Sequence, residues 1–355
     1  MKKIMKKIFK ILTFFLCIVF LCIFGGLLFF TLSDYQPATT EIIANSETPD
    51  TIPINKALQI ITWNIGYAGL DKNMDFFYDG GTKVRPTEQQ VQKNMEGINC
   101  YLSKNVDSDF FLIQEIDEDA KRSYYKNQIL YFDSILPNYH YFYAMNFNVR
   151  FVPQPFTNPM GKVKSGLVIY SIFSPKVAER NAFPFNFSWP LRIFMLDRGF
   201  ISMRFPTSNG KELVLVNTHN SAFDKNGEIR KAELDYFSKF LIEEYDKGNY
   251  VLVGGDFNQC PVNIKTEFQG QPFDFADFYI IPDTLFPANW QFIFDNSTPS
   301  NRRVEKSYKK GETKVTLIDF FICSPNISVE SIKCDNLDFE FSDHNPVKAT
   351  LKLTE

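Results

Sequence analysis

The sequence lacks the excess of positive charge that is typical of proteins dedicated to nucleic acids. Its 355 residues include 38 basic and 41 acidic side chains, for a net charge of −3. Five of the lysines lie before residue 11, so the rest of the chain has 33 basic residues against 41 acidic ones. This balance argues against a strongly basic nucleic-acid groove, although bound metal ions can supply positive charge locally.

Paired cysteine motifs and internal repeats are also missing. No Cys-x-x-Cys pair occurs among the six cysteines, which disfavours a thiolate zinc centre. Cys17 and Cys22 belong to an apolar N-terminal run. The other four are compatible with buried free thiols or, in an oxidising compartment, with disulfides: Cys100, Cys260, Cys323 and Cys334.

A long apolar run from Ile11 to Leu32 follows a lysine-rich segment, residues 1–10. At about 22 residues it is long enough to cross a bilayer, which needs roughly 20, whereas the apolar part of a cleaved signal peptide spans about 7–15. The run predicts a transmembrane signal anchor (11–32); a cleaved signal peptide and a lipid-modified cysteine are the alternatives. Basic residues stay in the cytoplasm, so we expect a single-pass membrane protein with its catalytic domain outside the cytoplasm.

The remaining chain divides into a polar segment, residues 33–56, and one long domain, residues 57–355. The polar segment is rich in threonine and is expected to be a linker. Strands are predicted near residues 58–64, 110–115, 166–171, 212–217, 250–253, 316–322 and 346–353. Helices are predicted at about 86–102 and 228–245. Several strands are apolar on both faces, which indicates an α/β fold of two packed sheets with helices outside.

Polar side chains that bind metal or phosphate follow several of these strands. The most informative strings are Gly254-Gly255-Asp256-Phe257-Asn258 and Ser342-Asp343-His344. A carboxylate and an amide two residues apart point to the same face of an extended chain. A carboxylate next to a histidine adds a metal ligand, a base or an anion-stabilising cation. Similar groups end other strands: Asn64, Glu115, His219 and Asp319. The set predicts a phosphoester-cleaving site fed by several strands.

Six segments that carry these residues resemble, in order, the motifs of the endonuclease/exonuclease/phosphatase superfamily. They are Thr62–Ile65, Leu112–Glu115, Val216–His219, Gly254–Asn258, Leu317–Phe320 and Ser342–His344. The superfamily includes deoxyribonuclease I-like nucleases, exonuclease III-like repair nucleases, bacterial sphingomyelinases and inositol polyphosphate phosphatases. The resemblance implies a four-layer α/β/β/α sandwich of two packed mixed sheets and an Mg²⁺-dependent enzyme, with Mn²⁺ as a possible substitute.

The resemblance also implies a role for each acidic or amide residue at the metal. Glu115 would be the principal metal ligand, with Asn64 nearby holding metal or phosphate. Asp343 would be a further metal ligand or a site carboxylate. Hard oxygen ligands of this kind suit Mg²⁺.

The catalytic roles implied by the resemblance fall on five residues. Asp256 would orient or deprotonate the attacking water, and Asn258 would position it and the phosphate. His344, held in its tautomer by Asp319, would sit on the phosphoryl oxygens. His219 would stabilise charge or protonate the leaving group.

Other candidates are weaker. Tyr67 and Arg198 are possible phosphate contacts, against a structural tyrosine and a surface ion pair. His140 lies in an aromatic strand and is expected in the core or on the surface. Residues 183–191 alternate aromatic and other residues. They predict either an edge segment that covers the core or an exposed ridge that dips into lipid, as in sphingomyelinase-like relatives.

Three functions fit these observations. The first is a metal-dependent phosphodiesterase or phosphatase outside the cytoplasm, acting on a small molecule or lipid headgroup. The second is an exported deoxyribonuclease I-like nuclease. The third is a non-catalytic binding module, which is disfavoured because no expected catalytic position is missing. The acidic balance and the predicted anchor favour the first, and no protein partner is indicated.

Overall fold

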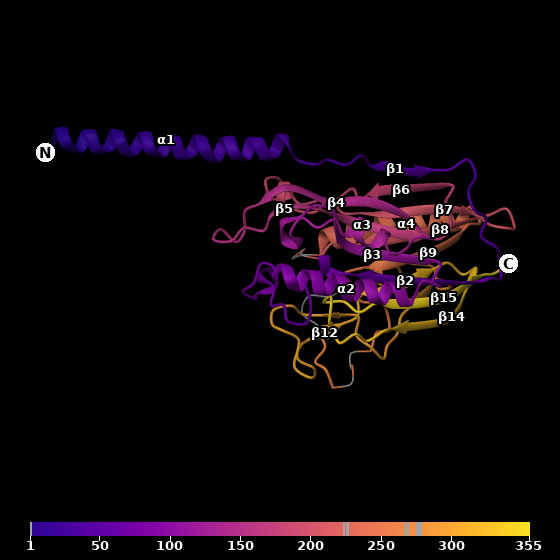
Figure 1. Cartoon of the computed structure of the whole chain (residues 1–355). Coiled ribbons are helices and arrows are strands. Elements are labelled where there is room, and N and C mark those ends of the chain that lie inside the picture. The colour runs from indigo at the N-terminus through magenta and orange to yellow at the C-terminus, as the bar shows by residue number, and fades with distance from the viewer. Residues whose placement is uncertain (1, 223, 225–226, 266–267, 269, 275–278) are drawn as a thin grey trace.

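Two packed β-sheets with helices on their outer faces form the body of the protein in a computed structural model of the chain (Figure 1). The structure describes residues 2–222, 224, 227–265, 268, 270–274 and 279–355. The first sheet has seven strands, in the spatial order β1 (Thr40–Asn45), β6 (Val177–Ala182), β7 (Gly199–Pro206), β8 (Glu212–His219), β9 (Tyr250–Asp256), β13 (Asp319–Cys323) and β10 (Gln291–Ile293). The second has six: β14 (Ile327–Cys334), β15 (Val347–Leu353), β2 (Ala57–Asn64), β3 (Phe110–Asp117), β5 (Gly161–Ser171) and β4 (His140–Val152). A short ribbon pairs β11 (Asn301–Arg302) with β12 (Val315–Thr316).

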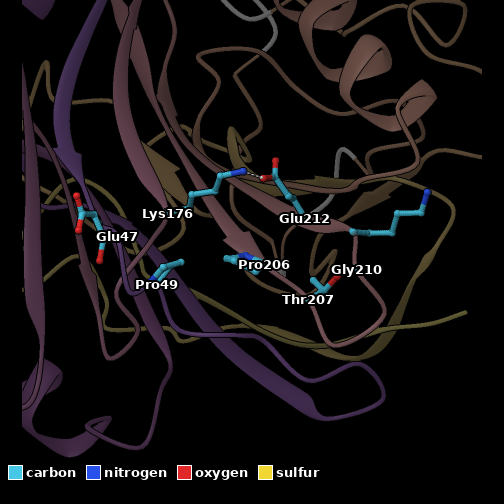
Figure 2. Close-up of a pocket in the computed structure, with 9 residues that line it drawn as sticks. Glu47, Pro49, Lys176, Pro206, Thr207, Gly210 and Glu212 are labelled. Atoms are coloured by element: carbon cyan, nitrogen blue, oxygen red, sulfur yellow. Dashed lines mark hydrogen bonds and ion pairs between the residues drawn. The ribbon is translucent and has the colours of Figure 1, made fainter.

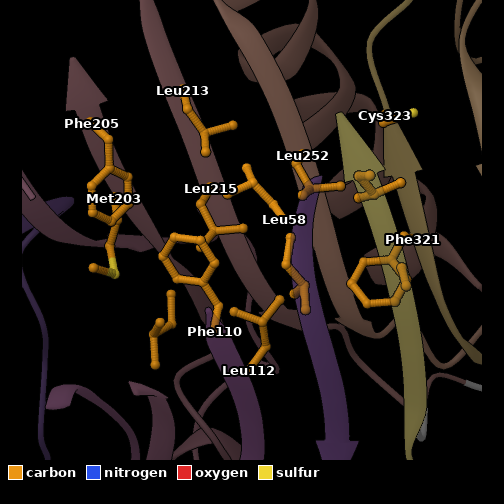
Figure 3. Packing of buried hydrophobic residues seen from close by; sticks show 14 of the residues in the cluster. Leu58, Phe110, Leu112, Met203, Phe205, Leu213, Leu215, Leu252, Phe321 and Cys323 are labelled. Atoms are coloured by element: carbon orange, nitrogen blue, oxygen red, sulfur yellow. The ribbon is translucent and has the colours of Figure 1, made fainter. Parts of the chain in front are cut away.

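The two sheets bury an apolar layer between them, as Figure 3 shows. Phe110 and Leu112 of β3 lie in this layer with Leu213 and Leu215 of β8. Because successive side chains of a strand point to opposite faces, the alternate residues of both strands face outward. There they pack against helices instead of water.

Helices cover both outer faces. α2 (Glu88–Lys104) packs Val91, Met95, Ile98 and Leu102 against the six-stranded sheet. α4 (Glu228–Asp246) packs Leu234, Phe237 and Leu241 against the seven-stranded sheet. The short helix α3 (Gln128–Asp133) lies on the α2 side. The four-layer α/β/β/α sandwich predicted from the sequence is therefore confirmed, and both predicted helices are present.

α2 begins where local chemistry favours it. Thr87 lies before the first turn in an extended conformation, and its side chain accepts a hydrogen bond from the backbone N–H of Gln90. This N-cap satisfies one of the free N–H groups of the first turn. In the part of the chain that the structure describes, four single turns of 3-10 helix connect other elements: η1 (Gly66–Ala68), η2 (Phe77–Asp79), η3 (Lys121–Ser123) and η4 (Leu191–Phe194).

Residues 33–56, interpreted from composition as a linker, contribute to the domain. β1 pairs antiparallel with β6 at the edge of the seven-stranded sheet. Ile52 is fully buried, and its N–H donates to the carbonyl of Pro206 at 2.8 Å. The composition was misleading because an edge strand keeps one face in solvent and therefore needs few apolar residues.

The strand predicted at 316–322 is divided into β12 and β13. Between them, the side-chain oxygen of Ser300 accepts hydrogen bonds from the N–H groups of Ile318 and Asp319, each at 3.0 Å. The carbonyl of Ile318 accepts the N–H of Phe257 at 2.9 Å. These bonds replace a sheet ladder, and they place Asp319 at the beginning of β13.

α1 (Lys2–Leu32) is a continuous apolar helix that leaves the body at the end where β4 and β5 lie (Figure 1). Within the described residues, it is the one helix long and apolar enough to cross a membrane, and its apolar stretch is unburied. These properties are those of a membrane anchor or of a signal sequence. All six cysteines are free thiols; Cys260, Cys323 and Cys334 are buried, whereas Cys100 is exposed.

Candidate active site

The polar strand ends predicted from the sequence meet at one edge of the two sheets. β8 and β9 run parallel, so His219 at the end of β8 is paired with Asp256 at the end of β9. β13 runs antiparallel to β9, and its first residue, Asp319, is also paired with Asp256. In the other sheet, parallel β2 and β3 end together, with Asn64 paired to the residue before Glu115. Each sheet therefore supplies half of the site.

His344 and Asp319 form a buried acid–imidazole pair. Nδ1 of His344 lies 2.7 Å from Oδ2 of Asp319. The same carboxylate oxygen accepts the hydroxyl of Ser300 at 2.7 Å, and Nε2 of His344 contacts the Asn301 amide at 2.9 Å. Burial opposes the charge on His344, but Asp319, Asp343 and Asp256 outweigh it and raise the pKa of His344 to about 10. The surrounding carboxylates thus favour the protonated, positively charged form of the imidazole.

Asn64 joins the two halves of the site. Its side-chain amide donates to Oδ2 of Asp256 at 2.9 Å and to Oε1 of Glu115 at 3.2 Å. Its oxygen accepts the N–H of Gly66 at 2.9 Å. These contacts make Asn64 a bridge that positions two carboxylates, and its expected role in holding metal or phosphate stays a prediction.

Glu115 occupies an unusual backbone position. Its φ of +52° lies in the left-handed region, which costs free energy for a residue other than glycine. The pairing of β3 with β5 shifts register between Ile113 and Ile116, so Glu115 lies in a bulge. A bulge redirects a side chain relative to the regular strand, and here the carboxylate points into the cavity.

Asp256 and Asp343 are crowded, buried carboxylates. Burial and the neighbouring Asp319 raise the pKa of Asp256 to about 6, although the Asn258 N–H donates to its Oδ1 at 2.9 Å. Burial is also the main reason why the pKa of Asp343 rises to about 7, with Glu115 adding to the shift. Such a concentration of negative charge favours a cation in the site.

Gly66 leaves room for Asp343. With φ of +49°, a side chain at this position would place its Cβ 2.9 Å from Oδ1 of Asp343 and 3.2 Å from Oγ of Ser342. Glycine adopts this backbone conformation without steric cost. Glycine two residues after Asn64 thus suits both the turn and the neighbouring carboxylate.

His219 differs from His344 in its charge. Its Nε2 lies 3.5 Å from Oδ2 of Asp256 and 3.9 Å from Oε1 of Glu115. Burial, with smaller effects from Arg198 and His344, holds the pKa of His219 well below its usual value. Burial thus favours the neutral form of His219, whereas the neighbouring carboxylates favour the charged form of His344.

A cavity of about 580 Å³ opens over these groups. Every predicted site residue lines it except Asn64 and Asp319, which lie behind the lining. Tyr67 is buried under the guanidinium of Arg122, 3.7 Å from the ring centre, and its hydroxyl has no hydrogen-bond partner among the described residues. Arg198 donates to the carbonyl of His219 at 3.4 Å. His140, by contrast, lies exposed at the start of β4.

A second surface cleft lies at the opposite end of the seven-stranded sheet, near the beginning of β8 (Figure 2). Its charged lining includes Lys176 and Glu212, which form an ion pair of 2.8 Å. This cleft contains none of the residues predicted for the site.

Two buried amides between the sheets had not been predicted. Nε2 of Gln114 donates to Oδ1 of Asn217 at 2.7 Å, and Asn217 donates to the carbonyls of Ile113 and Val168. Gln114 precedes Glu115, and Asn217 lies two residues before His219. Both amides lie in segments that resemble motifs of the superfamily, so this resemblance could have identified them from the sequence. Ser300 and Asn301 lie outside every segment and carried no such signal.

A family model for the endonuclease/exonuclease/phosphatase family matches residues 61–344. The chain belongs to this family. The matched range contains both halves of the site, from Asn64 at its beginning to His344 at its end. Members of the family are hydrolases that act on phosphoesters. No curated protein matches this chain in a sequence comparison.

Solved structures share the fold at low sequence identity. An endonuclease/exonuclease/phosphatase from Beutenbergia cavernae is 16% identical, with a TM-score of 0.58 over 84% of this chain and 72% of that one. ANGEL2, a 2′,3′-cyclic phosphatase, is 14% identical, with a TM-score of 0.55 over 84% of this chain and 96% of that one. D. rerio TDP2, complexed with a single-strand DNA product, is 14% identical, with a TM-score of 0.52 over 84% of this chain and all of that one.

The donor set fits a hard divalent cation. Ligand atoms of Asp256, Asp319 and His344 lie within 4.8 Å of one another, but Asp319 and His344 are already bonded to each other. Glu115 and Asp343 instead line the cavity beside these groups. Carboxylate oxygens that face a cavity are the ligands Mg²⁺ prefers, since this ion keeps several of its waters.

Proposed function

We propose that this protein is a divalent-metal-dependent phosphoester hydrolase, anchored by α1 with its site outside the cytoplasm. The observation that carries the proposal is the buried His344–Asp319 pair, with His344 next to Asp256 and Asn258 in one cavity. Cleavage of a phosphoester needs positive charge on the non-bridging oxygens and an oriented water. These residues provide both.

Each residue has a role in this proposal. Asp256, fixed by Asn64 and by the N–H of Asn258, would orient the water and accept its proton. His344 would donate a hydrogen bond to a phosphoryl oxygen, and neutral His219 would donate one to the leaving oxygen. Glu115 and Asp343 would hold Mg²⁺, or Mn²⁺ in its place. When bound, the ion neutralises charge on the phosphate and orients the ester.

Hydrolysis of bis-p-nitrophenyl phosphate by the full-length protein tests the proposal. Wild type should release nitrophenolate with Mg²⁺ or Mn²⁺ and lose the activity in excess EDTA. His344→Ala and Glu115→Ala should each abolish it, whereas Lys333→Ala, at an exposed ion pair with Asp335, should not. An inactive wild type at all tested metal concentrations would contradict the enzyme proposal.

A nuclease is the second candidate, because arginines also line the cavity. Arg122, however, is paired with Asp117 at 2.9 Å, and Arg302 donates to backbone carbonyls of the Leu70–Met74 segment. The other three arginines of the lining, Arg198, Arg230 and Arg303, also contact protein oxygens, which leaves little guanidinium capacity for a polymeric backbone, whose binding depends on several free cations. Incubation with supercoiled plasmid separates the two candidates: metal-dependent nicking would favour the nuclease.

A further inference from the structure

One wall of the catalytic cavity is apolar and reaches the end of α1. This wall consists of Phe147, Val152, Met160, Phe194 and Leu196. The same side chains pack together in one apolar cluster beside β4 and β5. The ring of Phe194 lies edge-on to Phe30 in the last turn of α1, with 5.5 Å between ring centroids. Phe194 therefore connects the cavity of the polar site directly to α1, the helix that can cross a membrane.

Further contacts fix this face to the end of α1. Nε1 of Trp189 donates to the hydroxyl of Thr31 at 3.1 Å. Arg192 forms an ion pair of 3.3 Å with Asp34, just after the helix. The guanidinium of Arg150 lies 5.9 Å from the ring centre of Phe29. Tryptophan and arginine at the end of an apolar helix are the residues that lie at the interface between a bilayer and water.

Large apolar side chains are exposed around these contacts. Phe156, in the connection between β4 and β5, is 84% exposed, and Trp189 is 56% exposed. Phe151 and Phe185 are also exposed. The segment 183–191 thus divides: Phe183 is buried against α4, whereas Phe185 and Trp189 are turned to the outside. Pro184 and Pro190 prevent the regular strand that would have put all its aromatic side chains on one side.

We propose that this face rests on the membrane that α1 enters and that the cavity takes a phospholipid from that membrane. The proposal rests on the hydrolase function above and names its substrate class. The phosphate of the lipid would lie at His344, and the glycerol and first acyl carbons along the Phe147–Phe194 wall. An apolar wall beside a polar site matches such an amphipathic molecule and offers little to a soluble, fully charged phosphate.

The reaction is a hydrolysis and needs no further reactant. The oxygen of water bonds to phosphorus, and one P–O ester bond breaks. Asp256 accepts the proton that water gives up and releases it to solvent, and the leaving oxygen takes up one proton from solvent, so no proton is gained or lost overall. The products are an alcohol and a phosphomonoester, of which one carries the acyl chains.

The experiment compares two substrates on the same protein. The full-length chain is reconstituted in vesicles of phosphatidylcholine and phosphatidylglycerol, and lipid products are followed by mass spectrometry. Hydrolysis of added bis-p-nitrophenyl phosphate, which is soluble, is measured in the same vesicles. The variant Phe156→Ser/Trp189→Ser removes two exposed aromatics that do not line the cavity. The matched control is Val106→Ser/Ile172→Ser, which changes exposed apolar residues at the opposite end of the six-stranded sheet.

We expect wild type to cleave both substrates. The aromatic variant should cleave lipid about tenfold more slowly or worse, because each aromatic loses its apolar contact with the bilayer, and should keep its rate on the soluble diester. The control should retain both rates. Equal loss of both rates in the aromatic variant would overturn the inference, as would wild-type cleavage of the diester without cleavage of lipid. If wild type cleaves neither substrate with Mg²⁺ or Mn²⁺, the hydrolase function itself fails.

Discussion

Asp319→Asn tests the reasoning about the charged imidazole most directly. The substitution keeps the shape of the side chain and removes the charge 2.7 Å from Nδ1 of His344. A hydrogen bond to a charged group contributes about 1.5–3 kcal/mol, roughly twice a neutral one. The variant should therefore lose about half of this, about 0.8–1.5 kcal/mol, which corresponds to a fall of about three- to tenfold in kcat/KM on the soluble diester.

The charge of His344 can be followed by NMR of its ring nitrogens, because the chain has only three histidines. In wild type the pKa of His344 is raised from 6.5 to about 10. The ion pair therefore stabilises the fold fully below pH 6.5, and this stabilisation is lost as the pH rises through about 10. In Asp319→Asn the ring should lose its proton at a lower pH.

Two results would refute this reasoning. One is an unchanged titration of His344 in the variant, and the other is a value of kcat/KM within twofold of wild type. Glu330→Gln is the control, since Glu330 pairs with Lys352 on the surface and lines no part of the cavity.

Three other substitutions have defined outcomes. Arg204→Met removes a guanidinium that contacts both carboxylate oxygens of Glu244 at 2.7 Å. The free energy of unfolding, measured in urea, should fall by about 2 kcal/mol. This loss is smaller than for a fully buried ion pair because Arg204 is partly exposed. Arg204 and its neighbours lower the pKa of Glu244 to about 2. The difference in the free energy of unfolding between wild type and variant should therefore be full above pH 4.5 and shrink as the pH falls toward 2. A difference that does not change with pH would show that the Arg204–Glu244 ion pair is not its cause. Gly66→Ala should displace Asp343 and raise the Mg²⁺ concentration for half-maximal activity about tenfold, and an unchanged metal titration would show that Asp343 is not a ligand. Glu115→Gln should weaken Mn²⁺ binding measured by electron paramagnetic resonance, with melting temperature as the check on folding.

Most of the architecture could be predicted because its signals are local. Strands buried on both faces read as continuous apolar runs, and α2 shows its buried residues at helical spacing. The strand-end residues Asn64, Glu115 and Asp256 were visible because a polar residue directly after such a run is conspicuous. The structure brings these predicted residues together at one edge of the sheets.

Other features depend on contacts between distant parts of the chain. β1 was not recognised, since its pairing with β6 lies in the backbone and its short apolar part, Ile42 to Ala44, stands in a polar, threonine-rich segment. Ser300 and Asn301 contact Asp319 and His344 from a connection without a motif. The bridging role of Asn64 likewise follows from two carboxylates on different sheets, which no spacing in the sequence encodes.

The amide bridge between Gln114 and Asn217 has a consequence for how such an enzyme tolerates change. Apolar layers between sheets resist separation but resist sliding weakly, because one methyl group packs nearly as well as the next. A hydrogen bond between two buried amides can form in only one alignment of the sheets, since a shift would leave buried donors without acceptors. The hydrogen bond between Gln114 and Asn217 thus fixes how the two sheets are aligned, one residue from Glu115 and two from His219. Leucines at both positions would remove the bridge and also the bonds that Asn217 donates to the carbonyls of Ile113 and Val168, so both the stability of the fold and the common register of the two half-sites should suffer.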